Sequence, residues 1–361
     1  MHTRSFAMLA IALTILLSLL GGNVRANPAS NAAIRVELAA DQTAFADTEG
    51  IIIHIAISNQ SNRPLKLLRW YTPVNGLEGP LFVVTRDGAP VEYIGALYKR
   101  SAPTAADYVT LDPGASLESS VDLAMFYDFS VSGTYAIEYD VAALALNTLR
   151  AEGDDQVIVD EDAIAAALAS NTLSLQVDGR AIWTPFDDEA SIASTDFVGC
   201  SSSRRSTLNR ARRKASAYAA DSASYLQSGK RGSRYTTWFG SYNSSRYRTV
   251  RSNFNKISDA MDSAPVTFHC TCTGNYYAYV YANRPYDIWL CNAFWSAPMT
   301  GTDSKAGTLV HEMSHFNVVA GTEDWAYGKS AAKRLARNNP GRAIDNADSY
   351  EYFAENTPAL P

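Results

Sequence analysis

The sequence predicts two domains: an N-terminal all-β sandwich of immunoglobulin-like kind, and a C-terminal, mainly α (α+β) domain with two disulfides. Short stretches with alternating apolar and polar residues, separated by turn signals, fill the first half of the chain. Helical periodicity and all four cysteines lie in the second half. The chain has 361 residues, 47% of them hydrophobic and 19% charged. These values are typical of two globular domains and exclude long disordered or coiled-coil regions.

Residues 1–26 have the features of a secretory signal peptide. A short basic start precedes an apolar run from Phe6 to Leu20, and Val24-x-Ala26 predicts cleavage after Ala26. A membrane anchor is less favoured, because a spanning helix needs roughly 20 apolar residues and two glycines end this run early. We therefore expect a secreted, extracellular protein that has no membrane partner after signal cleavage.

Residues 27–180 are predicted to form the β-sandwich. Alternating or β-branched stretches occur at residues 34–38, 51–57, 81–84, 116–118 and 135–139. Helix is expected only locally, at residues 161–168. His54 lies among isoleucines, and we interpret it as a structural histidine rather than a metal ligand. Residues 181–195 lack an apolar period and are predicted to be a linker.

Residues 196–361 are predicted to fold as the second domain, starting with a helix that Ser201 to Ser203 can cap and that runs to about Leu226. In an exported chain, four cysteines favour two disulfides over a four-thiolate zinc site, because their spacing is not that of a zinc finger. The Cys270-Thr271-Cys272 segment is too tight to bond to itself. Two pairings remain open: Cys200–Cys270 with Cys272–Cys291, or Cys200–Cys272 with Cys270–Cys291.

A stretch rich in Tyr, Ser and Arg, from Tyr235 to Tyr242, follows the predicted helix. Aromatic and basic residues in this mixture can stack on single-stranded nucleic acid. Because the chain is exported, we favour a tyrosine-rich surface that supports a helical core. No nucleic-acid partner is expected.

The main functional signal is the H-E-x-x-H sequence from His311 to His315. On a helix, positions i and i+4 share a face, so both imidazoles can bind one zinc ion while Glu312 faces a metal-bound water. A catalytic zinc also needs a third protein ligand and an open position. Asp324 can supply that ligand from a glycine-flanked turn, and Tyr327 can direct its phenol to the same centre.

H-E-x-x-H followed by G-T-x-D-x-x-Y-G resembles the pattern of the aspzincins, the deuterolysin-type zinc endopeptidases. The resemblance covers essentially all of residues 196–361 and is greatest to the peptidyl-Lys metalloendopeptidase branch, whereas residues 27–195 resemble only the pro-regions of bacterial members. It implies a zincin-type catalytic domain with one Zn²⁺ per chain. The implied ligands are His311, His315 and Asp324, with Glu312 as general base and Tyr327 as oxyanion donor. It also implies the disulfides Cys200–Cys270 and Cys272–Cys291.

Asp348 and Glu351 lie three residues apart, so on a helix they share a face and can form a pocket for a long cation. In the Lys-specific branch a like-spaced pair lines the pocket for the residue after the scissile bond. The resemblance therefore implies cleavage on the N-terminal side of Lys in protein and peptide substrates, with Arg as a lesser substrate. The alternatives are a broad, deuterolysin-like specificity and, in a different class, a zinc-stabilised extracellular binding module.

The two halves carry opposite charge. Residues 27–195 have a net charge of −15 and residues 196–361 one of +7, which favours docking. We therefore expect the acidic half to be a pro-domain, the intramolecular inhibitor of a monomeric zymogen.

By resemblance, the mature chain begins near Ser194 to Phe197. No Lys lies between Lys99 and Lys214, so strict cleavage before Lys cannot create that end. Relaxed self-cleavage or another protease is needed. Charge alone makes Lys99, in a predicted loop, a candidate to occupy the Asp348/Glu351 pocket of the latent precursor.

Overall fold

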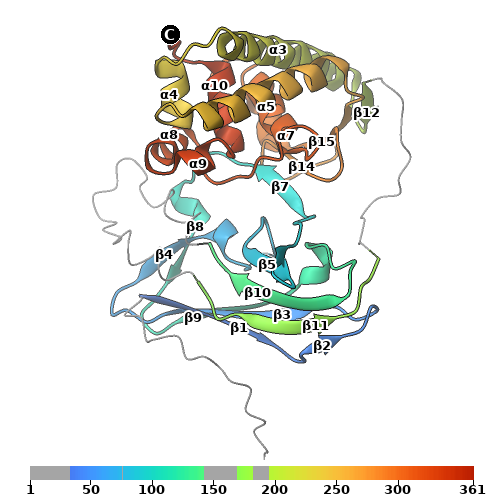
Figure 1. Cartoon of the computed structure of the whole chain (residues 1–361), viewed down its shortest axis with the longest axis vertical. Coiled ribbons are helices and arrows are strands. Elements are labelled where there is room, and N and C mark those ends of the chain that lie inside the picture. Colours follow the sequence, from blue (N-terminus) through green and yellow to red (C-terminus); the bar gives the residue numbers. More distant parts are fainter. Residues whose placement is uncertain (1–32, 75, 142–168, 182–194) are drawn as a thin grey trace, which may run out of the picture. The chain divides into compact units, whose positions relative to one another are not determined.

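The computed structural model describes residues 33–74, 76–141, 169–181 and 195–361 (Figure 1). The predicted signal peptide, the helix expected at residues 161–168 and most of the predicted linker lie outside the described residues. Within the described ranges, no helix combines the length and the apolar character needed to cross a membrane.

The described part of the first half is mostly β. An antiparallel sheet has the order β1-β3-β9, formed by β1 (Ile34–Ala40), β3 (Ile52–Asn59) and β9 (Ser116–Asp122). A second sheet has the order β2-β11-β10-β5-β6, formed by β2 (Ala44–Phe45), β11 (Leu173–Val177), β10 (Gly133–Tyr139), β5 (Phe82–Arg86) and β6 (Ala89–Pro90). Strands β4 (Leu65–Leu68) and β8 (Tyr108–Leu111) form a separate pair. Three 3-10 turns accompany the strands: Arg69–Tyr71, Ala105–Asp107 and Leu123–Met125.

Side-chain alternation decides which face of each strand is buried. Ile34, Val36 and Leu38 of β1 point inward, and the residues between them are exposed. Apolar side chains of both larger sheets belong to one core. The prediction of an all-β first half is thus confirmed for the described residues as mostly β, whereas its immunoglobulin-like character stays a prediction. His54 faces polar groups, with Nδ1 2.7 Å from Ser120 Oγ.

The second half is mainly helical, as predicted. Its helices are α3 (Ser202–Gln227), α4 (Ser233–Phe239), α5 (Ser244–Ser263), α6 (Asn292–Ser296), α7 (Lys305–His315), α8 (Lys329–Asn338), α9 (Pro340–Ala343) and α10 (Ala347–Glu355). Ser201 caps α3, because its side chain accepts a hydrogen bond from the Arg204 amide. The apolar stripe of α3, including Leu208 and Ala211, is fully buried.

The Tyr/Ser/Arg-rich stretch differs from the surface that we predicted. Tyr235, Trp238 and Phe239 lie on α4 and are buried in the core, at 0%, 3% and 0% exposure. Polar residues between these rings made the helical period difficult to recognise in the sequence. We therefore predicted a tyrosine-rich surface, whereas in the structure the rings fill the interior. Buried rings have no free face for a nucleic-acid base.

Two disulfides join Cys200 to Cys270 and Cys272 to Cys291. Of the two pairings that the sequence left open, this is the one implied by the resemblance.

A mixed sheet connects the two halves of the chain. Its order is β12-β13-β15-β14-β7, with β12 (Asp196–Val198), β13 (Thr267–His269), β15 (Asp287–Leu290), β14 (Ala278–Tyr281) and β7 (Ala96–Lys99). Strand β7 comes from the first half, yet it is one of the two edge strands of this sheet and is antiparallel to β14 (Figure 1). The prediction of a loop around Lys99 was therefore wrong. Because its partner strand, β14, is remote in the sequence, the pairing of β7 cannot be predicted from local sequence patterns.

Candidate metal centre and lysine pocket

Helix α7 carries the H-E-x-x-H motif, and all of its residues are buried. Ser304 caps it by accepting a hydrogen bond from the Gly307 amide at 2.9 Å. The Glu355 side chain of α10 packs against Gly307, where an added Cβ atom would be only 2.2 Å from Glu355 Oε1. A larger residue at position 307 would displace the Glu355 carboxylate. The acidic face of α10 lies beside His311, whose Nδ1 is 3.0 Å from Asp348 Oδ1 and 3.4 Å from Glu351 Oε2.

The three predicted metal ligands converge. His311 Nε2 and His315 Nε2 are 3.1 Å apart. Asp324 Oδ1 lies 3.3 Å from His311 Nε2, and Asp324 Oδ2 lies 3.5 Å from His315 Nε2. Two imidazole nitrogens and a carboxylate around one point form a donor set that zinc accepts, with room for a fourth ligand.

The outer nitrogens of both imidazoles lie close to oxygen atoms, a carbonyl for His315 and a carboxylate for His311. His315 Nδ1 lies 2.6 Å from the carbonyl oxygen of Thr322. Because a carbonyl only accepts hydrogen bonds, Nδ1 carries the proton and the Nε2 lone pair faces the centre. His311 Nδ1 lies 3.0 Å from Asp348 Oδ1. The sequence did not identify Thr322, since any residue can supply a carbonyl.

Backbone contacts position Asp324. The chain turns back after α7 at Gly321, whose φ of 59° favours glycine. The Thr322 amide then donates to Ser314 O at 3.1 Å, and the Glu323 amide donates to Asp345 O at 2.8 Å. The turn is therefore tied both to the motif helix and to the segment before α10.

Glu312 is fully buried beside the ligands. Neither its carboxylate oxygens nor those of Asp324 have a hydrogen-bond partner among the described residues. Buried carboxylates without partners are costly, which fits a site built for a cation and a water. Burial raises the pKa of Glu312 well above its ordinary value, and burial lowers the pKa of His315 to about 4. A neutral imidazole is the form that binds a metal.

Asp348 and Glu351 lie on α10 and form a pocket that Lys99 fills. Lys99 Nζ is 3.1 Å from Asp348 Oδ1 and 2.7 Å from Glu351 Oε2, and all three side chains are fully buried. Asp303 Oδ1 lies 3.7 Å from the same nitrogen. Burial alone would lower the pKa of Lys99, but the two carboxylates raise it well above its ordinary value. The ammonium is therefore charged.

Tyr327 lies where the two halves of the chain meet. Its ring is almost completely buried and packs edge-on against Trp70, with centroids 6.1 Å apart. Burial, and then the Asp324 carboxylate, raise the pKa of Tyr327 well above its ordinary value. A cavity of about 480 Å³ borders Asp324, Tyr327, Trp70 and Tyr71. The contact between Trp70 and Tyr327 could not be predicted from the sequence, because the two residues are far apart in the chain.

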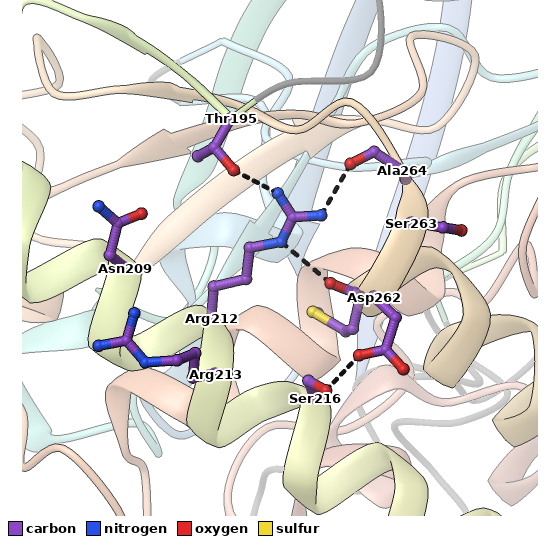
Figure 2. Close-up of a pocket in the computed structure, with 9 residues that line it drawn as sticks. Thr195, Asn209, Arg212, Arg213, Ser216, Asp262, Ser263 and Ala264 are labelled. Atoms are coloured by element: carbon purple, nitrogen blue, oxygen red, sulfur yellow. Dashed lines mark hydrogen bonds between the residues drawn. The ribbon is translucent and has the colours of Figure 1, made fainter.

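Another hollow, of about 620 Å³, surrounds Arg212 (Figure 2). The Arg212 guanidinium donates to Thr195 Oγ1 at 2.5 Å, Met261 O at 3.0 Å and Ala264 O at 2.7 Å. Because these N–H groups are hydrogen-bonded to protein oxygens, we interpret Arg212 as a structural residue that holds Thr195, the residue before β12, in place.

Comparisons with known proteins identify the family that this chain resembles. Residues 224–355 match the family model of the aspzincins, described as lysine-specific metallo-endopeptidase. The chain is 42% identical over 320 residues to an extracellular protease of Aeromonas hydrophila. The aligned residues cover 86% of this chain and 90% of that protein. The chain is also 41% identical over 287 residues to a peptidyl-Lys metalloendopeptidase of Grifola frondosa, and the aligned residues cover 78% of this chain and 77% of that protein. A solved zinc peptidase from Grifola frondosa is 52% identical over 45% of this chain and 100% of its own, with a TM-score of 0.44.

Proposed function

Because the chain belongs to the aspzincin family of zinc metalloendopeptidases, we propose that it is made as an exported precursor whose active form cleaves peptide bonds on the N-terminal side of Lys. One observation carries the proposal of specificity: a buried lysine, Lys99, lies between Asp348 and Glu351. The relatives named as peptidyl-Lys metalloendopeptidase and extracellular protease support the substrate class and the export.

We assign the ligands of one zinc ion to His311, His315 and Asp324, whose donor atoms converge. When bound, zinc supplies Lewis-acid polarisation of a water and of the substrate carbonyl. Glu312, whose oxygens have no hydrogen-bond partner in the described part of the chain, takes the proton of the attacking water and returns it to the leaving amine. Tyr327 donates a hydrogen bond to the developing oxyanion.

The pocket selects a long cation by charge and depth. Two carboxylates face one ammonium, and the rings of Tyr277 and Tyr352 have their centroids 5.4 and 5.5 Å from Lys99 Nζ. Arginine carries the same charge on a wider, planar group, so it is the expected lesser substrate. Broad, deuterolysin-like specificity is the alternative.

We further propose that residues 27–180, as an immunoglobulin-like sandwich, are the pro-domain and inhibit the enzyme within the same chain. Four contacts support this role: β7 pairs with β14, Lys99 fills the pocket, Trp70 packs on Tyr327, and Glu92 Oε1 accepts from Asn317 Nδ2 at 2.6 Å. Substrate needs the same pocket and the same tyrosine, so it cannot enter while these contacts persist.

The contacts of Thr195 refine the expected maturation site. Arg212 holds Thr195, and β12 begins at Asp196 with parallel pairing to β13 (Figure 2). A cut after Asp196 would remove a strand residue from the catalytic sheet. We therefore place the mature N-terminus at or before Thr195.

The test is a digest of an unfolded protein by the secreted, processed chain, with the new N-termini read by mass spectrometry. We expect cuts before Lys that a zinc chelator abolishes. Cuts without preference for Lys would favour the deuterolysin-like alternative, and no cuts with zinc bound would favour a zinc-stabilised binding module.

A second test addresses processing. The Glu312→Gln precursor, purified alone, should stay intact if maturation is self-catalysed. If it still matures near residue 195 without added protease, self-processing is excluded.

A further inference from the structure

Strand β7 lies on β14 in the manner of a bound peptide. The two strands are antiparallel, with Lys99 opposite Ala278 and Tyr98 opposite Tyr279. The Tyr277 amide also donates to Lys99 O at 3.0 Å. Main-chain hydrogen bonds of this kind hold an added strand whatever its sequence, and pockets for its alternating side chains give selectivity. The Lys99 pocket is one of these, and the next residue of the strand, Tyr98, identifies a second.

Tyr98 points away from the lysine pocket and onto aromatic rings of the second half. Its ring centroid is 4.8 Å from that of Tyr276 and 5.3 Å from that of Tyr279. Tyr279 in turn stacks on Trp289 at 5.2 Å with an interplanar angle of 6°, and Trp289 stacks on His269 at 4.4 Å with an angle of 12°. A row of four rings thus crosses the sheet, because successive members are cross-strand neighbours on β7, β14, β15 and β13. The members of this row are Tyr98, Tyr279, Trp289 and His269, and Tyr276 lies beside Tyr98.

Removal of the first half would take away only the outermost ring of this row. The faces of Tyr276 and Tyr279 that Tyr98 covers would then be open to a peptide on β14. Trp289 supports Tyr279 from behind, so the uncovered ring keeps its orientation. A flat ring held in this way favours another aromatic ring or a large planar side chain.

We propose that Tyr276 and Tyr279 form an aromatic subsite of the mature enzyme for the substrate residue that precedes Lys. The inference rests on the proposed function, because Tyr98 precedes Lys99 in the segment that occupies the site. It adds a second selective position next to the cleaved bond, with Tyr, Phe and Trp as the preferred residues.

The residue after Lys gives a useful contrast. Arg100 pairs with Glu78 Oε2 at 3.0 Å and lies over the ring of Trp70 at 5.1 Å, and both of these partners belong to the first half. From the second half it meets the ring of Tyr276 at 4.6 Å. Most of this environment leaves with the pro-domain, so the position after Lys should discriminate less than the position before it.

Three synthetic hexapeptides test the subsite with the processed enzyme: Ala-Ala-Tyr-Lys-Ala-Ala, Ala-Ala-Ala-Lys-Ala-Ala and Ala-Ala-Ala-Lys-Tyr-Ala. We expect kcat/KM to be about fivefold higher for the first peptide than for the second, the size of one favourable ring pair. The third should differ from the second by less than about twofold.

Variants of Tyr279 separate the subsite from a structural role. Tyr279→Phe keeps the ring and should keep the preference, whereas Tyr279→Leu should bring the first two peptides to equal kcat/KM while cleavage of the second persists. Tyr276→Leu should reduce the preference, and the matched control Tyr242→Leu, at an exposed tyrosine outside the row, should leave it unchanged. Thermal unfolding of each variant verifies the fold.

Calorimetry with the same peptides in the presence of a chelator gives Kd values that do not depend on catalysis. Tighter binding of the first peptide, lost in Tyr279→Leu, supports the subsite even if no bond is cut, in which case only the proposed function fails. Equal Kd and kcat/KM for the first two peptides would overturn the subsite. A preference for the third peptide would also overturn it, since β7 would then run opposite to a substrate.

Discussion

Two buried polar clusters meet at His311, and they balance their charge in different ways. In the metal-ligand cluster, Asp324 lies against the two imidazoles, and neither Asp324 nor Glu312 forms an ion pair with a lysine or arginine within the described residues. In the lysine pocket, Asp348 and Glu351 face the ammonium of Lys99. Burial of an uncompensated charge is costly. The first cluster therefore needs a cation from outside, and the second contains a cation from its own chain.

The difference bears on how latency and specificity are related. Lys99 reaches its pocket from the first half of the chain, so the pocket is balanced only while that half stays docked. After removal of the pro-domain, two carboxylates are left without their cation, and a substrate lysine is the natural replacement. In this view the contact that keeps the precursor inactive is the same contact that later selects the substrate.

The largest expected effect concerns the unpaired base. Glu312→Gln keeps the shape of the side chain but cannot accept the proton of the attacking water. We expect kcat to fall by about 10³- to 10⁴-fold, with zinc content and thermal stability unchanged. Peptide cleavage, elemental analysis and calorimetry measure these three quantities. An active variant with zinc bound would show that another group is the base.

The next prediction concerns the cation of the metal-ligand cluster. Asp324→Ala removes one of three converging donors, and zinc affinity should fall by more than about 100-fold, since loss of an outer partner alone costs up to that much. Zinc in the dialysed protein is the readout, with Asp259→Ala, at an exposed aspartate of α5, as the control. Full zinc content in Asp324→Ala would exclude this residue as a ligand.

Loss of the internal cation should act on stability rather than on zinc. In the Glu312→Gln precursor, Lys99→Met leaves two buried carboxylates without a partner, and the free energy of unfolding should fall by about 3 kcal/mol. Urea unfolding measures this change. Lys66→Met, at an exposed lysine of β4, is the matched control. Equal stability of the two variants would mean that the ion pair contributes nothing to the stability of the precursor.

The sequence predicted the parts of the site that lie in short local motifs. His311, Glu312 and His315 lie on one helix, and Asp348 and Glu351 lie on another. Within each helix, the spacing in the sequence is enough to place these side chains near one another. The pairing of the cysteines needed the family resemblance, because spacing left two possibilities.

Contacts between distant segments left no such signal. Thr322 orients His315 through a backbone carbonyl, which every residue possesses. The stretch Ala96–Lys99 has the length of an ordinary strand, and nothing in it shows that its partner is β14. Charge suggested the site of Lys99, but the strand that carries it there was predicted as a loop. Long-range pairing depends on the packing of the whole chain.

The half-buried carboxylate of Asp345 lies outside both clusters and extends the comparison, because neither a metal ligand set nor a lysine neutralises it among the described residues. Asp345 Oδ2 accepts from Trp325 Nε1 at 3.1 Å beside the turn that carries Asp324. Burial raises the pKa of Asp345 to about 6, against the smaller opposing effects of Trp325 and Arg342. A raised pKa means that folding favours the neutral acid, so its stabilising contribution is complete below the ordinary pKa of about 4 and is lost as the pH rises through about 6.

Asp345→Asn should therefore gain stability relative to the parent chain as the pH rises, because the amide stays neutral. In the Glu312→Gln precursor, we expect this gain to be about 1–2 kcal/mol between pH 4 and pH 7.5, measured by urea unfolding at both values. Asp112→Asn, at an exposed turn residue, is the control. A difference that does not change with pH would show that Asp345 is already balanced in the folded chain. The turn would then owe its position to the backbone bond between Glu323 and Asp345 and not to the protonation of this side chain.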